Sequence, residues 1–437
     1  FKNIKKLLSG EIVTIDNKNI LEKKNYWDLK EKINKTKKDR KKFNYSDNLD
    51  ELSNLIEKCV KSHLISDVEI GSFLSGGIDS SLATYYMQKN SEKKIKTFSV
   101  GFREKEYDES EESTKIANFL KTDHHQLFMK DEDILESFEK ITSIYDEPFA
   151  DPSQIPTIFI SKEAKKKVKV IISGDGGDEL FGGYNRYIIS GKTTINKFDL
   201  KIFIKKIIAK IHKLLPKKFI EIVGKALNLK YDLNERILSY KKFLKLPDLE
   251  KYLFHLSQNN LKNILKKEYI ASIKNLDKFN DNLKSLYEKY MFLDTINYLP
   301  NSILTKVDRA SMSVGLEVRV PLLDSRMVNY SWKIPIENKI NNQNQKIILK
   351  KVLKRIFPEN LISTKKKGFG IPLDSWLRTV FLKKADELLT FDSLEKNKIF
   401  NSYFVRKMWN DHKNENGNFG KELWNIIILQ LWFEKNL

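Results

Sequence analysis

The stretch Val68-Glu69-Ile70-Gly71-Ser72-Phe73-Leu74-Ser75-Gly76-Gly77-Ile78-Asp79-Ser80-Ser81 decides the fold of this chain. Its apolar first half predicts a buried strand, and the apolar residues at helical spacing after Ser81 predict a helix. Between them, two glycines permit backbone conformations closed to other residues and let main-chain N–H groups approach an oxyanion. The helix would direct the positive end of its dipole to the same point. The stretch therefore predicts an anion-binding loop, with Asp79 as a carboxylate suited to Mg²⁺.

The kind of anion follows from what the loop lacks. It has no Gly-Lys-Ser/Thr ending, which P-loop nucleotidases use to bind the β- and γ-phosphates. Its pattern is typical of enzymes that attack the α-phosphate of ATP and release pyrophosphate. The plainer interpretation is a Gly-Ser turn between a strand and a helix, but the added hydroxyls and the acid favour a phosphate site.

A second cluster follows the apolar run Val168–Ser173 and reads Gly174-Asp175-Gly176-Gly177-Asp178-Glu179. Ligands of parallel sheets bind at the carboxyl ends of strands, so we expect both loops to face one crevice. Three acids within five residues repel one another unless a cation lies between them. The cluster therefore predicts a metal–phosphate site.

Four further segments stay ambiguous from their residues alone. The loop 146–156 carries acids and three prolines, and it is either a wall of a substrate site or a rigid connection. Charged residues at 306–309 and 317–319 predict internal ion pairs in an apolar context. Lys346 precedes a helical pattern and would, taken alone, be an exposed helix start.

Composition excludes several classes of protein. The net charge of +21 comes mostly from dispersed Lys rather than Arg, which argues against a dedicated nucleic-acid surface. The longest apolar run, 424–433, is about half of a membrane span. The single cysteine, Cys59, falls on the apolar face of a helix and excludes a disulfide framework. We therefore expect no nucleic acid, no membrane and a cytoplasmic location.

The 437 residues predict two or three units at roughly 150 residues each. Residues 1–28 alternate weakly, as a strand pair around Ser9-Gly10 would, and a Lys-rich linker covers 29–48. Alternating strands and helices over 49–191 predict an α/β core with a doubly wound parallel sheet, and 192–437 is mainly helical. The expected strands are 68–74, 95–100, 125–128 and 168–173. The expected helices of the second part are 201–230, 283–299, 347–356 and 421–433.

Taken in order, seven motifs resemble the glutamine-hydrolysing asparagine synthetase family. They are Ser75–Ser81, Phe98–Phe102, Glu147–Ser153, Ser173–Tyr184, Leu304–Met312, Glu317–Asp324 and Lys366–Pro372. The resemblance runs from about residue 44 to the last residue and implies a sheet of the pyrophosphate-loop ATP-pyrophosphatase type.

The resemblance also implies roles for individual residues, which we state as expectations. Adenine would be bound by the backbones of Leu74 and Val100, with Ser173 and Gly174 beside the nucleotide. The pyrophosphate cradle would be Ser75, Gly76, Gly77, Ser80 and Ser81. Asp79 and Asp178 would bind Mg²⁺, and Lys346 would stabilise the charge on departing pyrophosphate. Glu179 and Tyr184 would shape the acceptor pocket. Asp175 stands where many family members have Glu, which leaves its part in proton transfer open.

The implied chemistry is an ATP-dependent amidation. A carboxylate attacks the α-phosphate of MgATP to give an acyl-adenylate and pyrophosphate, and ammonia then displaces AMP. Aspartate is the expected acceptor, and the nitrogen comes from glutamine or free ammonia. The family's glutaminase half uses an N-terminal Cys that this chain lacks, and residues 1–28 resemble only the last strands of that half. We therefore expect a fragment of a longer protein.

Three alternatives remain at this stage. An amidotransferase that amidates a uronic-acid sugar of a surface polysaccharide would carry the same motifs. A tRNA-modifying pyrophosphate-loop protein would suit the charge of +21 but usually needs catalytic cysteines. A non-catalytic nucleotide-binding module would be expected to have lost Asp79, Asp178 and Glu179. A homodimer is compatible with each of these.

Overall fold

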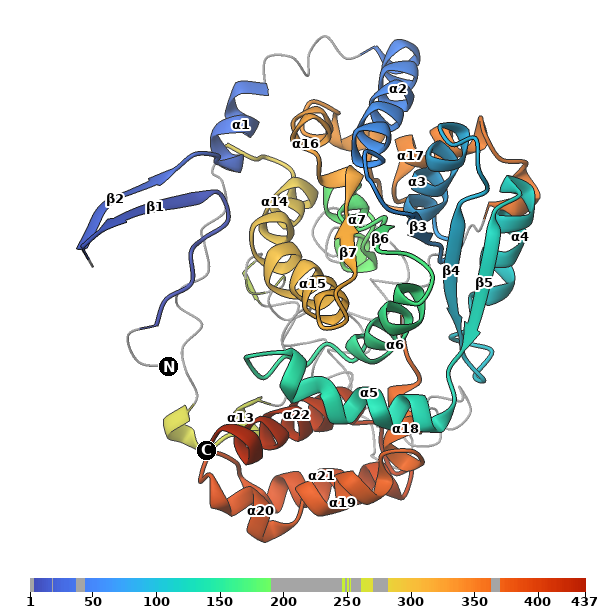
Figure 1. Ribbon diagram of the computed structural model, residues 1–437. Helices are drawn as coiled ribbons and strands as arrows, with labels where there is room; N and C mark the ends of the chain where they lie inside the picture. The colour runs from blue at the N-terminus through green and yellow to red at the C-terminus, as the bar shows by residue number, and fades with distance from the viewer. Residues whose placement is uncertain are drawn as a thin grey trace, which may run out of the picture.

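A five-stranded parallel sheet in the order β5-β4-β3-β6-β7 forms the centre of the protein (Figure 1). The computed structural model describes residues 4–17, 19–36, 44–189, 246–247, 250, 252, 261–269, 282–362 and 370–437. The predicted helix 201–230 and residues 366–369 lie outside them. The strands are β3 (Ile70–Phe73), β4 (Lys96–Gly101), β5 (Asp123–Phe128), β6 (Val170–Ile172) and β7 (Glu317–Arg319).

The order of the strands makes the sheet doubly wound. From β3 the chain moves outward to β4 and β5 through α3 (Ile78–Lys89) and α4 (Ser110–Leu120). It then returns through α5 (Asp131–Ile144) and α6 (Gln154–Lys165) to β6, on the other side of β3. Right-handed crossovers in opposite directions lie on opposite faces of a sheet. The predicted α/β class is confirmed, and the switch point lies between β3 and β6, where ligands of such sheets bind.

The fifth strand, β7, was not predicted from the sequence. Its three residues pair in parallel with β6, from Val170 opposite Glu317 to Ile172 opposite Arg319. The segment is short and two of its three side chains are charged, so it carries neither the apolar run of a buried strand nor a turn signal. The four predicted strands are all present, and each strand end lies within two residues of its predicted position.

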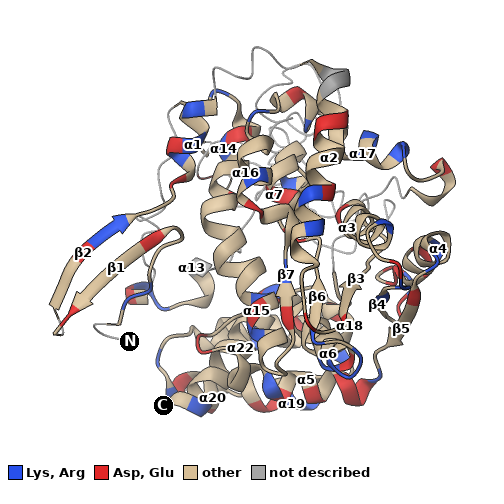
Figure 2. Ribbon diagram, turned by 45° about the horizontal axis from the view of Figure 1, so that its top comes forward, with Lys and Arg blue, Asp and Glu red and all other residues tan. Residues whose placement is uncertain are grey.

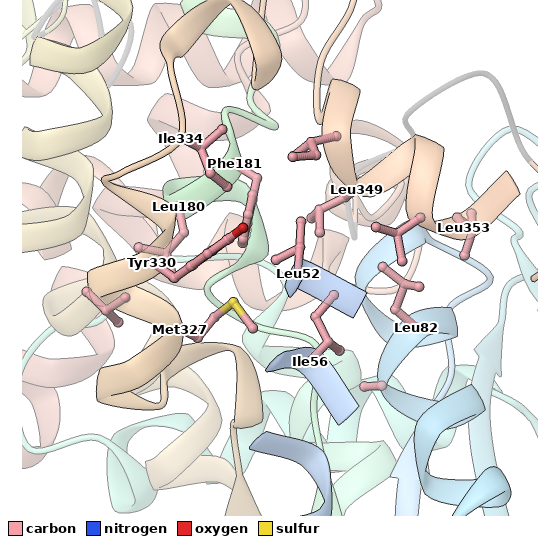
Figure 3. Packing of buried hydrophobic residues seen from close by; sticks show 14 of the residues in the cluster. Leu52, Ile56, Leu82, Leu180, Phe181, Met327, Tyr330, Ile334, Leu349 and Leu353 are labelled. Atoms are coloured by element: carbon pink, nitrogen blue, oxygen red, sulfur yellow. The ribbon is translucent and has the colours of Figure 1, made fainter. Parts of the chain in front are cut away.

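Helices next to the switch point share one hydrophobic cluster. It joins α2 (Tyr45–His63), α3, α7 (Gly177–Phe181), α16 (Ser325–Ser331) and α17 (Ile347–Lys354). Figure 3 shows side chains of these helices meeting there, among them Leu82 of α3, Phe181 of α7 and Leu349 of α17. Cys59 is buried in the same cluster, as its helical spacing predicted. The helices that follow the two motif loops are therefore held against one another.

The C-terminal part is mainly helical, as predicted, and forms a second cluster with α5 and α6. Its helices are α18 (Leu373–Arg378), α19 (Leu382–Leu388), α20 (Phe391–Lys396), α21 (Ser402–Lys413) and α22 (Gly420–Asn436). The segments before it are α13 (Leu261–Ile264), α14 (Leu286–Leu293), a π-helix (Asp294–Leu304) and α15 (Thr305–Met312). Short 3₁₀ turns cover Lys267–Tyr269, Pro321–Leu323, Ile336–Asn338 and Glu359–Leu361.

The N-terminal residues form an antiparallel hairpin that projects from the rest of the chain (Figure 1). Its strands are β1 (Glu11–Asp16) and β2 (Asn19–Asn25), so the strand pair lies after Ser9-Gly10 rather than around it. The misplacement arose because Gly10, with φ of +77°, forms a turn ahead of β1 instead of the hairpin loop. Within the predicted linker, Leu29–Thr36 form helix α1. Among the described helices, none is long and apolar enough to cross a bilayer.

A buried histidine gives the fold a testable response to acid. His412 is 0% exposed, and its Nδ1 accepts the Phe419 amide at 3.0 Å. Burial lowers the pKa of His412 to about 4, whereas an unfolded histidine titrates near about 6.5. Between these values the unfolded chain binds the proton and the native chain does not, so stability falls as the pH falls.

We expect wild type to lose stability relative to His412→Gln as the pH decreases from about 7 to about 4.5, by on the order of 1 kcal/mol. Paired thermal melts of the two proteins across this range measure the change. A constant difference in melting temperature at all pH values would contradict the assignment.

Candidate active site

The loop Ser75–Ser81 has the geometry of an anion site. Gly76 has φ of +75°, the left-handed conformation that glycine tolerates, and α3 begins at Ile78 with Gly77 as its N-cap. The Ser75 amide donates to Ser80 Oγ at 3.3 Å, and the Gly77 amide donates to Ser75 Oγ at 3.3 Å. Main-chain donors, hydroxyls and a helix N-terminus thus converge at the carboxyl end of β3, the arrangement that oxyanions favour.

The loop after β6 packs directly on this anion loop. A Cβ at Gly174 would lie 2.6 Å from the Ser80 amide nitrogen, and one at Gly177 would lie 2.4 Å from Asp79 Cγ. A side chain at 174 would displace backbone atoms of the anion loop, and one at 177 would displace the side chain of Asp79. The expectation that two loops after neighbouring strands face one crevice is correct.

Lys346 connects the two loops through its ammonium group. Its Nζ donates to Asp79 and lies 2.5 Å from Asp178 Oδ1, although 267 residues separate Lys346 from Asp79. Lys346 is 5% exposed, so it is not the exposed helix start that its sequence context alone suggested. Burial opposes its charge, but Asp178 and Asp79 outweigh burial and raise the pKa of the ammonium above its usual range. At neutral pH the group is a cation between two carboxylates.

Glu179, Tyr184 and Asp175 form the neighbouring wall. The Tyr184 hydroxyl donates to Glu179 Oε1 at 2.5 Å, and the Ser173 hydroxyl donates to Asp175 Oδ2 at 2.6 Å. Burial and then Asp178 raise the pKa of Glu179 to about 8, so this carboxyl is largely protonated at neutral pH. Burial also raises the pKa of Asp175, although Ser173 opposes the shift.

All the residues that the sequence predicted for the site line one cavity of about 770 Å³. They are Leu74, Ser75, Gly76, Gly77, Asp79, Ser80, Ser81, Val100, Ser173, Gly174, Asp175, Asp178, Glu179, Tyr184 and Lys346. The Ser81 hydroxyl is buried and has no hydrogen-bond partner among the described residues. Such a group is costly unless a ligand satisfies it.

Lys306 and Arg186 line the same cavity, and each belongs to a buried ion pair whose partner the sequence did not indicate. Lys306 Nζ lies 3.2 Å from Asp151 Oδ2 and donates to Ser153 Oγ at 2.8 Å. Asp151 outweighs the burial of Lys306 and raises the pKa of its ammonium, which keeps the lysine charged. The pair places the proline-rich loop at the cavity wall, one of the two interpretations that its residues allowed.

The second pair joins Arg186 Nη2 to Asp294 Oδ2 at 2.6 Å. The guanidinium carbon lies 3.7 Å from the centre of the Tyr184 ring and 4.7 Å from that of Tyr298. Arg186 follows Tyr184 by two residues, so proximity to the motif was the one signal that could have indicated it. Asp294 carried no such signal.

The carboxylates of Asp79 and Asp178 fit a divalent cation. Both contact the ammonium of Lys346, so one cation is within reach of both. Within the part of the chain that the structure describes, no group of three or more His, Cys, Asp or Glu could hold a metal by itself. Mg²⁺ is commonly bound by one or two carboxylates together with substrate phosphates. These two residues therefore suit Mg²⁺ that arrives with a phosphate ligand.

The fold and site define a doubly wound α/β protein with a cavity at its switch point, lined by groups that suit an anion. The asparagine synthase family model matches residues 51–434, and the chain belongs to this family. Glutamine-hydrolyzing asparagine synthetase 1 of Bacillus subtilis is 30% identical over 390 residues, which are 89% of this chain and 59% of that protein. A Methanocaldococcus jannaschii protein provisionally named glutamine-hydrolyzing asparagine synthetase 2 is 36% identical over 321 residues, 71% of this chain and 57% of that protein.

The family predicted from the motifs is therefore confirmed. It spans less than 60% of the length of these two relatives. Among solved structures, NMN synthetase from Francisella tularensis matches 33% of this chain and 60% of that chain with 15% identity. Its TM-score of 0.24 is too low to support an argument.

The contact between the loops predicts the effect of one methyl group. In Gly174→Ala the new Cβ would meet backbone atoms of Asp79 and Ser80, so one loop must move. We expect the ATP-dependent activity proposed below to fall at least about tenfold, because displacements of about 1 Å in a site are costly. The control is Gly417→Ala, whose Cβ would meet only the ring of Phe419, which can rotate. Equal turnover in both variants would contradict the role of the close approach.

Proposed function

We propose that this chain carries the ATP-dependent half of an asparagine synthetase. It binds MgATP, converts a carboxylate into an acyl-adenylate with release of pyrophosphate, and lets ammonia displace AMP to form the amide. The observation that carries the proposal is the contact of Lys346 with Asp79 and Asp178 beside the loop Ser75–Ser81.

The nucleotide end of the cavity has the groups that this reaction needs. The amides of the loop and the hydroxyls of Ser75, Ser80 and Ser81 would bind the phosphates, and Leu74 and Val100 would hold the adenine between the strands. Asp79 and Asp178 would hold Mg²⁺, which supplies charge neutralisation for the phosphates. Lys346 would stabilise the negative charge that develops on the leaving pyrophosphate, an electrostatic effect that is strong in a site shielded from water.

The acceptor end lies beyond Asp178, toward Glu179 and Tyr184. A protonated Glu179 can donate a hydrogen bond to the acceptor or to the carbonyl oxygen of its adenylate. Lys306 and Arg186 add two fixed cations to the same wall, each with its own carboxylate partner. Asp175 would receive a proton from the attacking ammonia. These features support a small anionic acceptor, and aspartate is our assignment.

The source of nitrogen and the division into domains are proposed from the family resemblance alone. We assign residues 1–28 to the last strands of a glutaminase domain, 29–48 to a linker, 49–191 to the α/β core and 192–437 to the helical part of the synthetase. Glutamine would supply nitrogen through such a domain, and free ammonia would replace it in vitro. The ATP requirement and the single buried cysteine favour the cytoplasm.

Substitution of Lys346 tests the mechanism. We expect Lys346→Met to lower pyrophosphate release in the presence of ATP, aspartate and ammonium at least about 100-fold, because the leaving group loses its cation. Lys351→Met, an exposed lysine of the same helix, is the matched control and should keep activity within about twofold of wild type. A folded Lys346→Met enzyme with wild-type turnover would disprove the assigned role.

A panel of acceptors tests the substrate. We expect aspartate to support formation of AMP, pyrophosphate and asparagine, and glucuronate or galacturonate to give no pyrophosphate above background. Product analysis by mass spectrometry identifies the amide. If a uronic acid drives pyrophosphate release and aspartate does not, the acceptor assignment fails and the sugar amidotransferase alternative replaces it.

A further inference from the structure

Lys350 is a second lysine at the cavity, one helical turn after Lys346. Lys346 is the N-cap of α17 and Lys350 lies in the first turn of that helix, where the Lys350 amide donates to the Lys346 carbonyl at 2.8 Å. Both side chains line the cavity. Lys350 is half-buried, whereas its neighbour Lys351 is exposed.

The two lysines differ in how their charges are balanced. Lys346 contacts two carboxylates. Within the described parts of the chain, no ion pair and no hydrogen bond reaches Lys350 Nζ, and burial together with the nearby Lys346 lowers the pKa of its ammonium. A half-buried cation beside another cation, without a carboxylate, is unfavourable by itself. Such a group is stabilised when an anion enters the cavity.

The anion that would enter at this point is the polyphosphate. The carboxylates of Asp79 and Asp178 reduce the positive charge that Lys346 can offer, while the loop amides are neutral donors. ATP carries most of its charge on the β- and γ-phosphates, and lysine binds phosphate as a mobile point charge. A flexible side chain one turn beyond Lys346 can reach an oxygen that Lys346 does not.

We propose that Lys350 is a further pyrophosphate-binding residue, whose ammonium contacts the β- or γ-phosphate of ATP and the pyrophosphate that leaves. The inference rests on the proposed function, since it assumes that the cavity binds ATP with its phosphates at the loop Ser75–Ser81. Lys346 then acts mainly on the bond that breaks between the α-phosphate and the pyrophosphate, and Lys350 binds the departing pyrophosphate. In Figure 2, Lys and Arg are spread over many elements of the chain, so this site is defined by its position in the cavity and not by a basic surface.

Two ligands that would occupy different parts of the ATP site, pyrophosphate and AMP, separate this role from a structural one. With the full chain at physiological salt and Mg²⁺, we expect Lys350→Met to weaken binding of inorganic pyrophosphate by about 10- to 100-fold in titration calorimetry. AMP, which lacks the β- and γ-phosphates, should bind within about twofold of wild type. Lys350→Arg should restore most of the pyrophosphate affinity, and Lys351→Met should change neither ligand.

Each of the other outcomes contradicts either the role of Lys350 or the proposed function. Pyrophosphate binding by Lys350→Met that stays within about twofold of wild type overturns the inference and leaves the proposed function intact. Equal weakening for AMP and pyrophosphate also overturns it, because the effect would then be on the fold of the cavity. If wild type binds neither ATP nor pyrophosphate, the proposed function itself fails.

Discussion

The contact of Lys346 with Asp79 and Asp178 is the interaction on which the whole site depends. It joins α3, α7 and the start of α17, which are far apart in the sequence. Breaking a buried ion pair by removing one partner is costly, because it leaves a buried charge without compensation. The backbone of Lys346 also adopts a left-handed conformation, with φ of 49°, which costs a non-glycine residue about 1 kcal/mol or more. The buried residues Ile348, Leu349, Val352 and Leu353 fix α17 against the core and maintain that conformation.

Sheet topology explains why these three elements meet. The strand order reverses at β3, so the loops after β3 and β6 lie side by side with no helix between them. Glycines at 174 and 177 then allow the second loop to pack on Asp79 and Ser80. Because α3, α7 and α17 share one hydrophobic cluster, the charged groups are attached to rigid elements rather than to loose loops. Rigid support of this kind keeps donors and carboxylates in place before a ligand binds.

The sequence predicted local features better than distant ones. Glycine loops after apolar strands indicated both the fold class and the cavity, because strand, turn and helix leave patterns within about ten residues. Contacts between residues far apart in the sequence leave no such pattern, and 155 residues separate Lys306 from Asp151. For Lys346, the motif resemblance alone indicated that the side chain was not exposed. The strand β7 was missed because three residues form no periodic signal. No sequence pattern singles out Lys350, since its significance depends on the absence of a nearby carboxylate among the described residues.

Local balance of charge, rather than the net charge of +21, determines what this cavity can recognise. Salt screens exposed lysines over about 8 to 10 Å, so dispersed surface charge attracts ATP and other anions without discriminating among them. Inside the cavity, Lys306 and Arg186 are each paired with an aspartate, and Glu179 is largely neutral at pH 7. In the proposed reaction, that wall receives a carboxylate and then an adenylate without a large change in charge. The opposite end combines amide donors, an ammonium between two carboxylates, and Lys350, which has no carboxylate partner among the described residues. These groups suit the anion of the proposed reaction, which arrives with its own metal ion and leaves as pyrophosphate.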